Sequence, residues 1–565
     1  MLLTRWGAAL DAEHPLPEYP RPQFARDSYI NLNGQWLYAI WPTATGFAGW
    51  QGSIVVPFSP EAALSGVHKF LRPDETLYYR TEIEIAPDFL KDVTLLHFGA
   101  VDSSCVVRLN GETIGSHQGG YTPFSFDISP LIHSGSNELI VEVTDPTDTS
   151  WVSRGKQSLK PHGIWYTAQS GIWQTVWLES LPANYLESVR IQPDIDRQVL
   201  VVTPSRDCRA RLLGRAVDLI GGRPNEIPVS DAELWTPETP HLYDIEFTAG
   251  DDIVRSYFGM RKFGVSADSA GHPRLMLNNQ PYFQHGLLDQ GYWPDGLLTP
   301  PSDEAMLADI QAAKRLGFNM MRKHIKIEPA RWYWHCDREG MLVWQDMVNG
   351  GTRYNPLITM VLPFLGIDLK DAHGFSRHDA PGRDAYYKEL DEMLDCLVNS
   401  VSIASWVPFN EGWGQFDANA AVEHIRQRDT SRVIDHASGW HDQGGGDVQS
   451  RHVYFRQVKA PRPDHRAFAL TEFGGYSQAV EGHVWRPGKA FGYKVFKTGK
   501  SWVAGFEKLY REQVVPLLAQ GLSAAIYTQL SDVEDEVNGL MTYDREVCKL
   551  PEELGQSIAN ELRLK

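Results

Sequence analysis

Residues 402–415 read SIASWVPFNEGWGQ, and this stretch is the clearest guide to the fold of the C-terminal half of the chain. Its apolar residues, up to Phe409, form the pattern of a buried strand. The strand then ends in an amide and a carboxylate, Asn410 and Glu411, before a break at Gly412. In a (β/α)8 barrel, catalytic residues lie at this end of the strands. Glu411 is therefore a candidate catalytic residue, against the simpler interpretation of a strand that ends in polar turn residues.

From about residue 275 onwards, strand-like and helix-like segments alternate along the chain. The predicted strands are 281–286, 318–322, 341–344, 403–409, 432–435, 468–472 and 524–529. The predicted helices are 302–316, 329–338, 386–398, 420–428 and 506–520. This alternation predicts a parallel (β/α)8 (TIM) barrel.

The first half of the chain has a different pattern, with short alternating strands and no helical period. Strands are predicted at 78–85, at 105–109 before the turn Asn110-Gly111, at 137–143 and at 171–178, which indicates a jelly-roll β-sandwich. Strands at 186–191, 199–203 and 242–247 indicate a smaller, immunoglobulin-like β-sandwich. The predicted domains are residues 1–180, 181–267 and 268–565.

Composition limits the classes of partner and compartment. A chain of 565 residues is too long for one hydrophobic core, and a formal net charge of −18 disfavours binding to nucleic acid or to an anionic membrane. The five scattered cysteines form no CxxC pair and are expected to be free thiols in a reducing compartment. The first residues lack the apolar stretch of a signal peptide, and no segment approaches ~18 consecutive apolar residues. We therefore expect a cytoplasmic protein.

A second strand ends in the same way as the first. Residues 468–472 read FALTE, so Glu472 also lies at the carboxyl end of a predicted barrel strand. Two carboxyl groups that meet in one pocket are what acetal hydrolysis requires, because one protonates the departing oxygen and the other stabilises or captures the sugar cation. A separation of about 5–5.5 Å gives retention of configuration, and one of about 6.5–9.5 Å gives inversion.

Several further segments resemble a known family: 31–36 (NLNGQW), 99–102 (GAVD), 110–111 (NG), 117–124 (HQGGYTPF), 170–173 (SGIW) and 409–411 (FNE). On these segments the chain resembles glycoside hydrolase family 2, the family of β-galactosidases, β-glucuronidases and β-mannosidases, over nearly its whole length. The order of the three predicted domains is also that of the family. The resemblance implies that Glu411 is the general acid/base, that Glu472 is the nucleophile, and that Asn410 binds the 2-hydroxyl of the sugar.

The resemblance implies other site residues on weaker grounds. Segment 319–322 (NMMR) is similar to the family's second strand, so Arg322 should hold the nucleophile, and His324 is a candidate sugar contact. Tyr454, on the expected sixth strand, is a candidate for orienting the nucleophile, although a core tyrosine is an equal alternative. The remaining candidates for substrate binding lie past predicted strand ends: Asp346, Trp440 and Gln529.

Departures from the family pattern narrow the expected substrate. Family members that cleave glucuronides carry an Asn-x-Lys element after the last strand, but residues 536–540 read EVNGL, without that lysine. The magnesium-binding sequence of the larger β-galactosidases is replaced by WQDMVNG at 344–350, so we expect no required metal and no cofactor. The loop at 531–538 is acidic, and at least two of its four carboxylates are expected to be solvated.

The sequence therefore predicts a retaining exo-β-glycosidase that acts on a neutral hexoside such as a β-galactoside. The jelly-roll domain is expected to close one side of the pocket and leave room for a terminal sugar. The alternatives are a β-mannosidase, a galactofuranosidase/arabinosidase-like enzyme, or a non-catalytic carbohydrate-binding protein. The expected partner is a small glycoside or oligosaccharide, and the sequence leaves open whether copies of the chain associate as a homo-oligomer.

Overall fold

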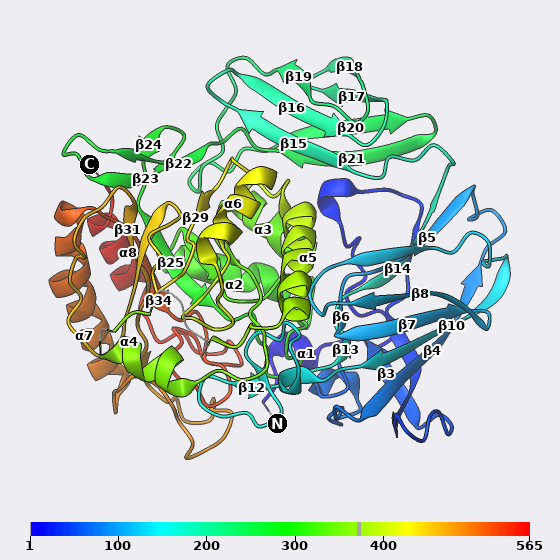
Figure 1. Ribbon diagram of the computed structural model, residues 1–565, viewed down its shortest axis with the longest axis horizontal. Helices are drawn as coiled ribbons and strands as arrows, with labels where there is room; N and C mark the ends of the chain where they lie inside the picture. Colours follow the sequence, from blue (N-terminus) through cyan, green and yellow to red (C-terminus); the bar gives the residue numbers. More distant parts are fainter. Residues whose placement is uncertain (1, 366, 370–374, 565) are drawn as a thin grey trace.

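The computed structural model describes residues 2–365, 367–369 and 375–564. Two β-sandwiches and a barrel make up the chain (Figure 1). The first sandwich (blue) and the second (green to cyan, at the top of the view) both pack against the barrel, which contains the C-terminal half of the chain. No helix among the described residues is both long and apolar enough to cross a membrane.

The first β-sandwich consists of two facing antiparallel sheets. Within the described residues, one sheet has the order β3-β2-β4-β10-β7-β8 and the other β1-β14-β5-β9. The strands of the first sheet are β2 (Gly34–Pro42), β3 (Gly52–Val56), β4 (Glu75–Ile85), β7 (Ser104–Leu109), β8 (Glu112–Gln118) and β10 (Gly135–Thr144). Those of the second are β1 (Tyr29–Asn31), β5 (Val93–Phe98), β9 (Phe124–Asp127) and β14 (Val176–Leu181).

Alternation along the strands builds the core of this sandwich. On β10, Leu139, Val141 and Val143 face inward and are fully buried, while the residues between them face out. The predicted turn at Asn110-Gly111 joins β7 to β8, and both residues have positive φ, +51° and +85°. This is the backbone that a two-residue hairpin requires and that Asn-Gly adopts readily.

The second β-sandwich has the size and layering of an immunoglobulin-like domain. Its sheets have the orders β15-β16-β19 and β18-β17-β20-β21 in the part of the chain that the structure describes. The strands are β15 (Val189–Asp194), β16 (Val199–Pro204), β17 (Cys208–Leu212), β18 (Arg215–Leu219), β19 (Asn225–Pro228), β20 (Tyr243–Ala249) and β21 (Asp252–Phe258). Leu200, Val202, Phe247 and Val254 are buried between the sheets.

The C-terminal half forms a parallel barrel. Its eight strands, in the order β29-β28-β27-β26-β25-β34-β31-β30, close on themselves over the described residues except between β29 and β30. The strands are β25 (Gln284–Asp289), β26 (Met320–Lys323), β27 (Leu342–Asp346), β28 (Ile403–Val407), β29 (Val433–Ile434), β30 (Val448–Val453), β31 (Ala467–Gly474) and β34 (Leu522–Thr528). The helices outside them are α2 (Asp303–Arg315), α3 (Ala330–Glu339), α5 (Ala380–Leu397), α6 (Ala418–Arg428), α7 (Gly499–Leu509) and α8 (Glu552–Glu561).

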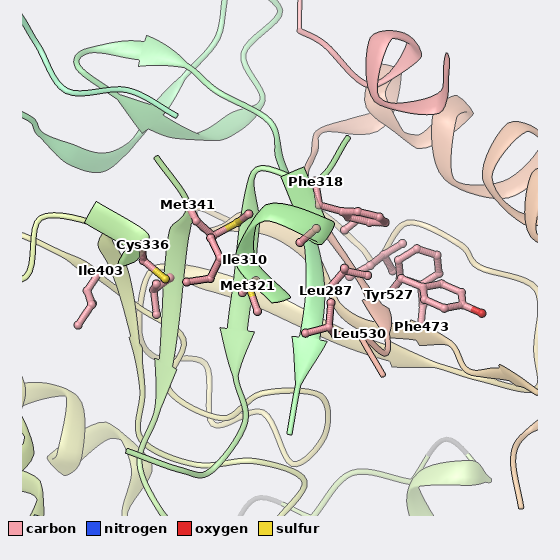
Figure 2. Close-up of a cluster of buried hydrophobic side chains, with 14 of the residues drawn as sticks. Leu287, Ile310, Phe318, Met321, Cys336, Met341, Ile403, Phe473, Tyr527 and Leu530 are labelled. Atoms are coloured by element: carbon pink, nitrogen blue, oxygen red, sulfur yellow. The ribbon is translucent and has the colours of Figure 1, made fainter. Parts of the chain in front are cut away.

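This architecture confirms the predicted fold class of two β-sandwiches followed by a (β/α)8 barrel, and the domain limits 1–180, 181–267 and 268–565 stay a proposal. Apolar side chains from the strands and from α2 and α3 form the core between barrel and helices, as Figure 2 shows. The labelled members are Leu287, Ile310, Phe318, Met321, Cys336, Met341, Ile403, Phe473, Tyr527 and Leu530. The small sheet β22 (Phe263–Ala267), β23 (Pro273–Leu277) and β24 (Gln280–Pro281) covers the amino end of the barrel with Leu275 and Leu277.

Two predicted helices differ from those observed. Of the predicted helix 506–520, the structure has α-helix only up to Leu509, where α7 ends. The rest is a π-helical turn and then a 3-10 segment that contains Pro516. A proline has no N–H to donate and disrupts the preceding helical turn. The predicted helix 386–398 begins earlier, at α5, because the Asp379 side chain caps it and Pro381 is tolerated in the first turn.

A loop of the first sandwich reaches the carboxyl end of the barrel. This 147–170 loop contains the short strands β11 (Gln157–Ser158) and β12 (Tyr166–Thr167). The backbone N–H groups of Arg154 and Gly155 donate to the carbonyl of Asn349 at 3.0 and 3.1 Å, and the ring of Trp165 lies 5.2 Å from that of Trp413. Residues from the first domain are thereby fixed beside the ends of β27 and β28.

A buried ion pair joins the two sandwiches. Arg26 donates to Asp252 of β21 at 2.9 and 2.8 Å and to Glu179 of β14 at 3.0 Å, and all three side chains are buried. Replacing Arg26 with methionine is expected to lower the free energy of unfolding by about 3–5 kcal/mol, because Asp252 stays buried without a cationic partner, whereas Glu179 keeps Arg21. Denaturant unfolding monitored by tryptophan fluorescence measures this change.

The matched control is Arg255→Met, which removes the exposed ion pair with Asp27. An exposed pair contributes little, so a loss of less than about 1 kcal/mol is expected. Equal losses in the two variants would contradict a stabilising role for the buried pair.

Candidate active site

Glu411 lies just past the carboxyl end of β28. Its backbone N–H donates to the carbonyl of Ser438 at 3.0 Å, and its φ is +51°. Non-glycine residues rarely adopt this conformation, and those that do are concentrated at functional sites. Gly412 follows with a φ of +77°, and a Cβ there would lie 2.7 Å from the ring of His441. The break predicted at Gly412 is thus a turn that glycine alone fits without strain.

Glu472 lies on β31 and is oriented through both of its carboxylate oxygens. Arg322 Nη1 donates to Oε1 at 3.1 Å, and the Tyr454 hydroxyl donates to Oε2. Tyr454 follows directly after β30, and its ring stacks on that of Tyr493 with 3.9 Å between centroids. The side chain of Glu472 therefore has little freedom to rotate.

His452, on β30, connects the two glutamates. Its Nδ1 lies 2.6 Å from Glu411 Oε1, and its Nε2 lies 3.6 Å from Glu472 Oε1. One ligand atom from each of the three side chains lies within 4.8 Å of the other two. The carboxyl ends of β28, β30 and β31 thus bring Glu411, His452 and Glu472 into one cluster.

Arg322, on β26, is the centre of a fully buried network. Its Nε and Nη2 donate to the two carboxylate oxygens of Asp346 at 2.9 Å each, and Nη2 also donates to Asn410 Oδ1 at 2.8 Å. The Nδ2 of Asn410 is buried without a hydrogen-bond partner among the described residues. Arg322 therefore fixes the Asn410 amide so that its N–H donors remain available.

Burial changes the protonation of the cluster. Burial raises the pKa of Glu411 to about 7, although the positive charges of Lys156 and Arg322 oppose the shift. Burial also raises the pKa of Glu472, opposed first by His452. Desolvation lowers the pKa of His452 to about 4, so this imidazole is neutral at pH 7. Glu411 can therefore carry a proton near neutral pH.

Asp346 and His324 extend the network towards the 147–170 loop. His324 Nδ1 lies 2.9 Å from Asp346 Oδ2, and burial holds the pKa of His324 well below its ordinary value. A neutral ring donates through Nδ1 to this carboxylate, which leaves Nε2 as an acceptor. That Nε2 is buried and has no hydrogen-bond partner among the described residues.

The last two predicted site residues lie in different surroundings. The ring of Trp440 lies 5.7 Å from that of His452, close to the cluster. Gln529 is fully buried, accepts a hydrogen bond from Gln290 at 2.7 Å, and donates to Asn538 at 2.9 Å. None of the hydrogen bonds that Gln529 makes within the described residues involves Glu411 or Glu472.

Three family models match the chain one after another. They are the sugar binding domain of glycosyl hydrolases family 2 at residues 69–182, the glycosyl hydrolases family 2 model at 185–261, and the TIM barrel domain of the same family at 299–487. The chain belongs to glycoside hydrolase family 2. The three matches occur in the order of the two sandwiches and the barrel of this family 2 chain.

Curated relatives include a beta-galactosidase of Photobacterium profundum, 25% identical over 76% of this chain and 45% of its own length. Another, a beta-galactosidase of Oenococcus oeni, is 27% identical over 60% of this chain and 34% of its own length. The family 2 chain thus spans less than half the length of these relatives.

Among solved structures, a GH2 beta-galacturonidase from Eisenbergiella tayi is 19% identical with a TM-score of 0.69, covering 96% of this chain and 98% of that one. A beta-D-glucuronidase of Dictyoglomus thermophilum is 16% identical with a TM-score of 0.74 and the same coverage.

Sequence reasoning missed three residues of the site. His452 lies on β30, a strand that the sequence analysis identified only through Tyr454. The residue pattern of 448–453 was the feature that could have revealed the strand. Tyr493 stacks on Tyr454 from a segment without strand or helix pattern. Lys156 comes from the 147–170 loop, and its charge acts on both Glu411 and Glu472. No local pattern in the sequence places a residue of the first domain beside the barrel.

The acidic loop at 531–538 corrects an expectation. Three of its four carboxylates are buried, those of Asp532, Glu534 and Glu536. The expectation that at least two of the four are solvated was therefore wrong. Asp532 forms an ion pair with Lys549 at 2.7 Å. Glu536 accepts a hydrogen bond from Tyr166 of the 147–170 loop. The loop is therefore a contact between the barrel and the first sandwich.

Glu411, His452 and Glu472 also have the donor types and spacing that could hold a metal ion. The guanidinium of Arg322 lies 3.1 Å from Glu472, and a second cation beside it would be repelled. We therefore assign the cluster to proton and carboxylate chemistry. The absence of a required metal stays a prediction.

Proposed function

We propose that this chain is a retaining exo-β-glycosidase that works by double displacement. The observation that carries the proposal is the separation of Glu411 and Glu472, whose carboxyl oxygens approach within 4.8 Å at the ends of two barrel strands. This is closer to the spacing of about 5–5.5 Å in retaining enzymes than to the about 6.5–9.5 Å that leaves room for a water in inverting ones. A carbohydrate-binding protein would have no need of this pair.

The two carboxyl groups have different surroundings and so different roles. Glu411, with a raised pKa of about 7, protonates the departing glycosidic oxygen. Glu472 accepts a hydrogen bond from Arg322, whose charge favours the ionised form, and as a carboxylate it attacks the anomeric carbon, which gives a covalent glycosyl-enzyme. In the second step Glu411, now deprotonated, removes a proton from the water that releases the sugar.

Neighbouring groups position the sugar in this scheme. Asn410 donates through its unpartnered Nδ2 to the 2-hydroxyl, a contact that strengthens in the transition state. His324 accepts a sugar hydroxyl through Nε2. The 147–170 loop lies against the carboxyl end of the barrel, which supports the exo mode of attack on a terminal sugar.

The substrate has two candidates. A neutral hexoside such as a β-galactoside is supported by the curated relatives named beta-galactosidase, with β-mannosides and galactofuranosides or arabinosides as alternatives on the same scaffold. A β-hexuronide is the second candidate, because Lys156, a lysine that is 6% exposed, lies beside Trp413 at the barrel mouth. Solved structures of the same fold include a beta-galacturonidase and several beta-glucuronidases.

A panel of nitrophenyl β-glycosides that covers these sugars tests the proposal. We expect turnover of at least one member, with the first-formed sugar in the β configuration by NMR before mutarotation. An α-configured first product would contradict double displacement. Saturable binding without turnover of any member would favour the carbohydrate-binding protein instead.

A further inference from the structure

Lys156 is a buried cation for which the described part of the chain provides no anionic partner. The residue is 6% exposed. Its ammonium group has no hydrogen bond or ion pair with any of the described residues. Two aromatic rings lie beside it: Nζ is 5.5 Å from the centre of the Tyr166 ring and 5.7 Å from that of Trp413. Lysine is almost never buried unless it is paired, and aromatic faces compensate only part of the lost hydration.

The backbone holds Lys156 in place from both sides. The preceding residues, Arg154 and Gly155, donate to Asn349 of the barrel, and the Lys156 carbonyl accepts from the N–H of Tyr166 at 2.9 Å. The following residue, Gln157, donates through its side chain to Asp102 at 2.7 Å. The position of the ammonium at the barrel mouth is therefore built into the contact between the two domains.

The ammonium lies near the candidate site, because the Trp413 ring beside it is 6.3 Å from the ring of His324. Its charge lowers the pKa of Glu411 and that of Glu472, and it also acts on His324. It lies more than 4.0 Å from every carboxylate among the described residues, because no ion pair forms. Lys156 therefore forms no ion pair with either glutamate, and its ammonium is available to contact a bound ligand.

Three other cations close to the site have anionic partners. Arg322 is bound to Asp346, Glu472 and Asn410, and Lys323 and Lys326 both contact Glu328, at 2.7 and 2.8 Å. A neutral sugar could offer Lys156 a hydroxyl oxygen but no compensating charge. A carboxylate would supply both the hydrogen-bond acceptor and the charge.

We propose that Lys156 is a carboxylate-binding residue of the substrate pocket and selects β-linked acidic sugars over their neutral counterparts. This inference rests on the proposed glycosidase function and names its substrate class. The lysine is supplied by the first sandwich, and the barrel segment at 536–540 carries none. Specificity and chemistry thus come from different domains.

The test compares wild-type protein with Lys156→Met, which keeps the length and apolar contacts of the side chain but removes its charge. Lys160→Met is the matched control, since Lys160 lies in the same loop and is exposed. Substrates are the 4-nitrophenyl β-D-galacturonide and β-D-glucuronide, each paired with its neutral galactoside or glucoside. For the uronides, Lys156→Met is expected to lower kcat/KM roughly 100-fold or more, mainly through KM, because a buried charge pair is broken.

For the neutral glycosides, kcat/KM should fall less than about tenfold, and Lys160→Met should change neither class. Wild-type protein that prefers neutral glycosides over uronides would overturn the proposal, and so would equal losses for both classes in Lys156→Met. If Lys156→Met fails to fold, Lys156→Arg replaces it and should retain the uronide preference because its charge remains. A folded Lys156→Arg variant could instead lose the preference for uronides while it cleaves neutral glycosides at the wild-type rate. That result would show that the positive charge does not select the uronide, and it would count against the proposal.

Calorimetric binding separates this inference from the proposed function. D-Glucuronate and D-galacturonate should bind wild-type protein more tightly than glucose and galactose, and this difference should vanish in Lys156→Met. Uronate binding that depends on Lys156 would uphold the subsite even if no glycoside were cleaved. Absence of any preference for uronates would overturn it even if neutral glycosides were cleaved with retention.

Discussion

Replacing Glu472 with alanine is expected to reduce turnover of nitrophenyl β-glycosides by roughly 10⁴-fold or more, as removal of a nucleophile does in other covalent mechanisms. In the proposed mechanism this buried carboxylate, held by Arg322 and Tyr454, is the group that attacks the anomeric carbon. Steady-state kinetics with a 4-nitrophenyl glycoside measure the loss. A variant that kept the wild-type rate would show that another group is the nucleophile.

Azide provides the positive test of the same role. A small anion can enter the space left by the Glu472 side chain and attack the substrate from the same face, so the alanine variant should form a glycosyl azide of inverted configuration. The matched control is Glu389→Gln, which alters a buried carboxylate on α5 that makes no hydrogen bond to the cluster within the described residues. It should keep turnover within a few-fold of wild type and show no response to azide.

Replacing Glu411 with glutamine is expected to act according to the leaving group. For a methyl or other alkyl glycoside, kcat/KM should fall by about 10²–10⁴-fold, because the departing oxygen needs a proton. For a 2,4-dinitrophenyl glycoside, which departs as a stable anion, kcat/KM should change little. Equal losses for both substrates would contradict the assignment of Glu411 as the general acid.

The pH profile gives an independent test of Glu411. Burial raises its pKa to about 7, so the protonated acid predominates below pH 7 and is lost as the pH rises through that value. In wild-type protein, kcat/KM for a poor leaving group should therefore fall on the alkaline side of about pH 7. The limb should be absent in Glu411→Gln, because the amide has no such proton to lose. A limb that persisted in the variant would belong to another group.

Much of the barrel follows from local sequence. Apolar runs such as 403–409 and 468–472 indicate buried strands, and their carboxyl ends identify Glu411 and Glu472 without tertiary information. Helix ends are harder to predict, because α5 begins in a Pro-Gly sequence that reads as a turn until the cap at Asp379 is seen. The helix expected at 506–520 changes form after Leu509 because Pro516 lies within it.

The sequence alone determined the fold class, the family resemblance and the candidate pair of glutamates, because each depends on residues close together in the chain. Only the tertiary structure placed His452 between Glu411 and Glu472 and connected Arg322 to Asp346 and Asn410. It alone brought Lys156 from the first sandwich to the mouth of the barrel. These contacts join residues separated by tens to hundreds of positions, and long-range packing leaves no periodic signal in the sequence.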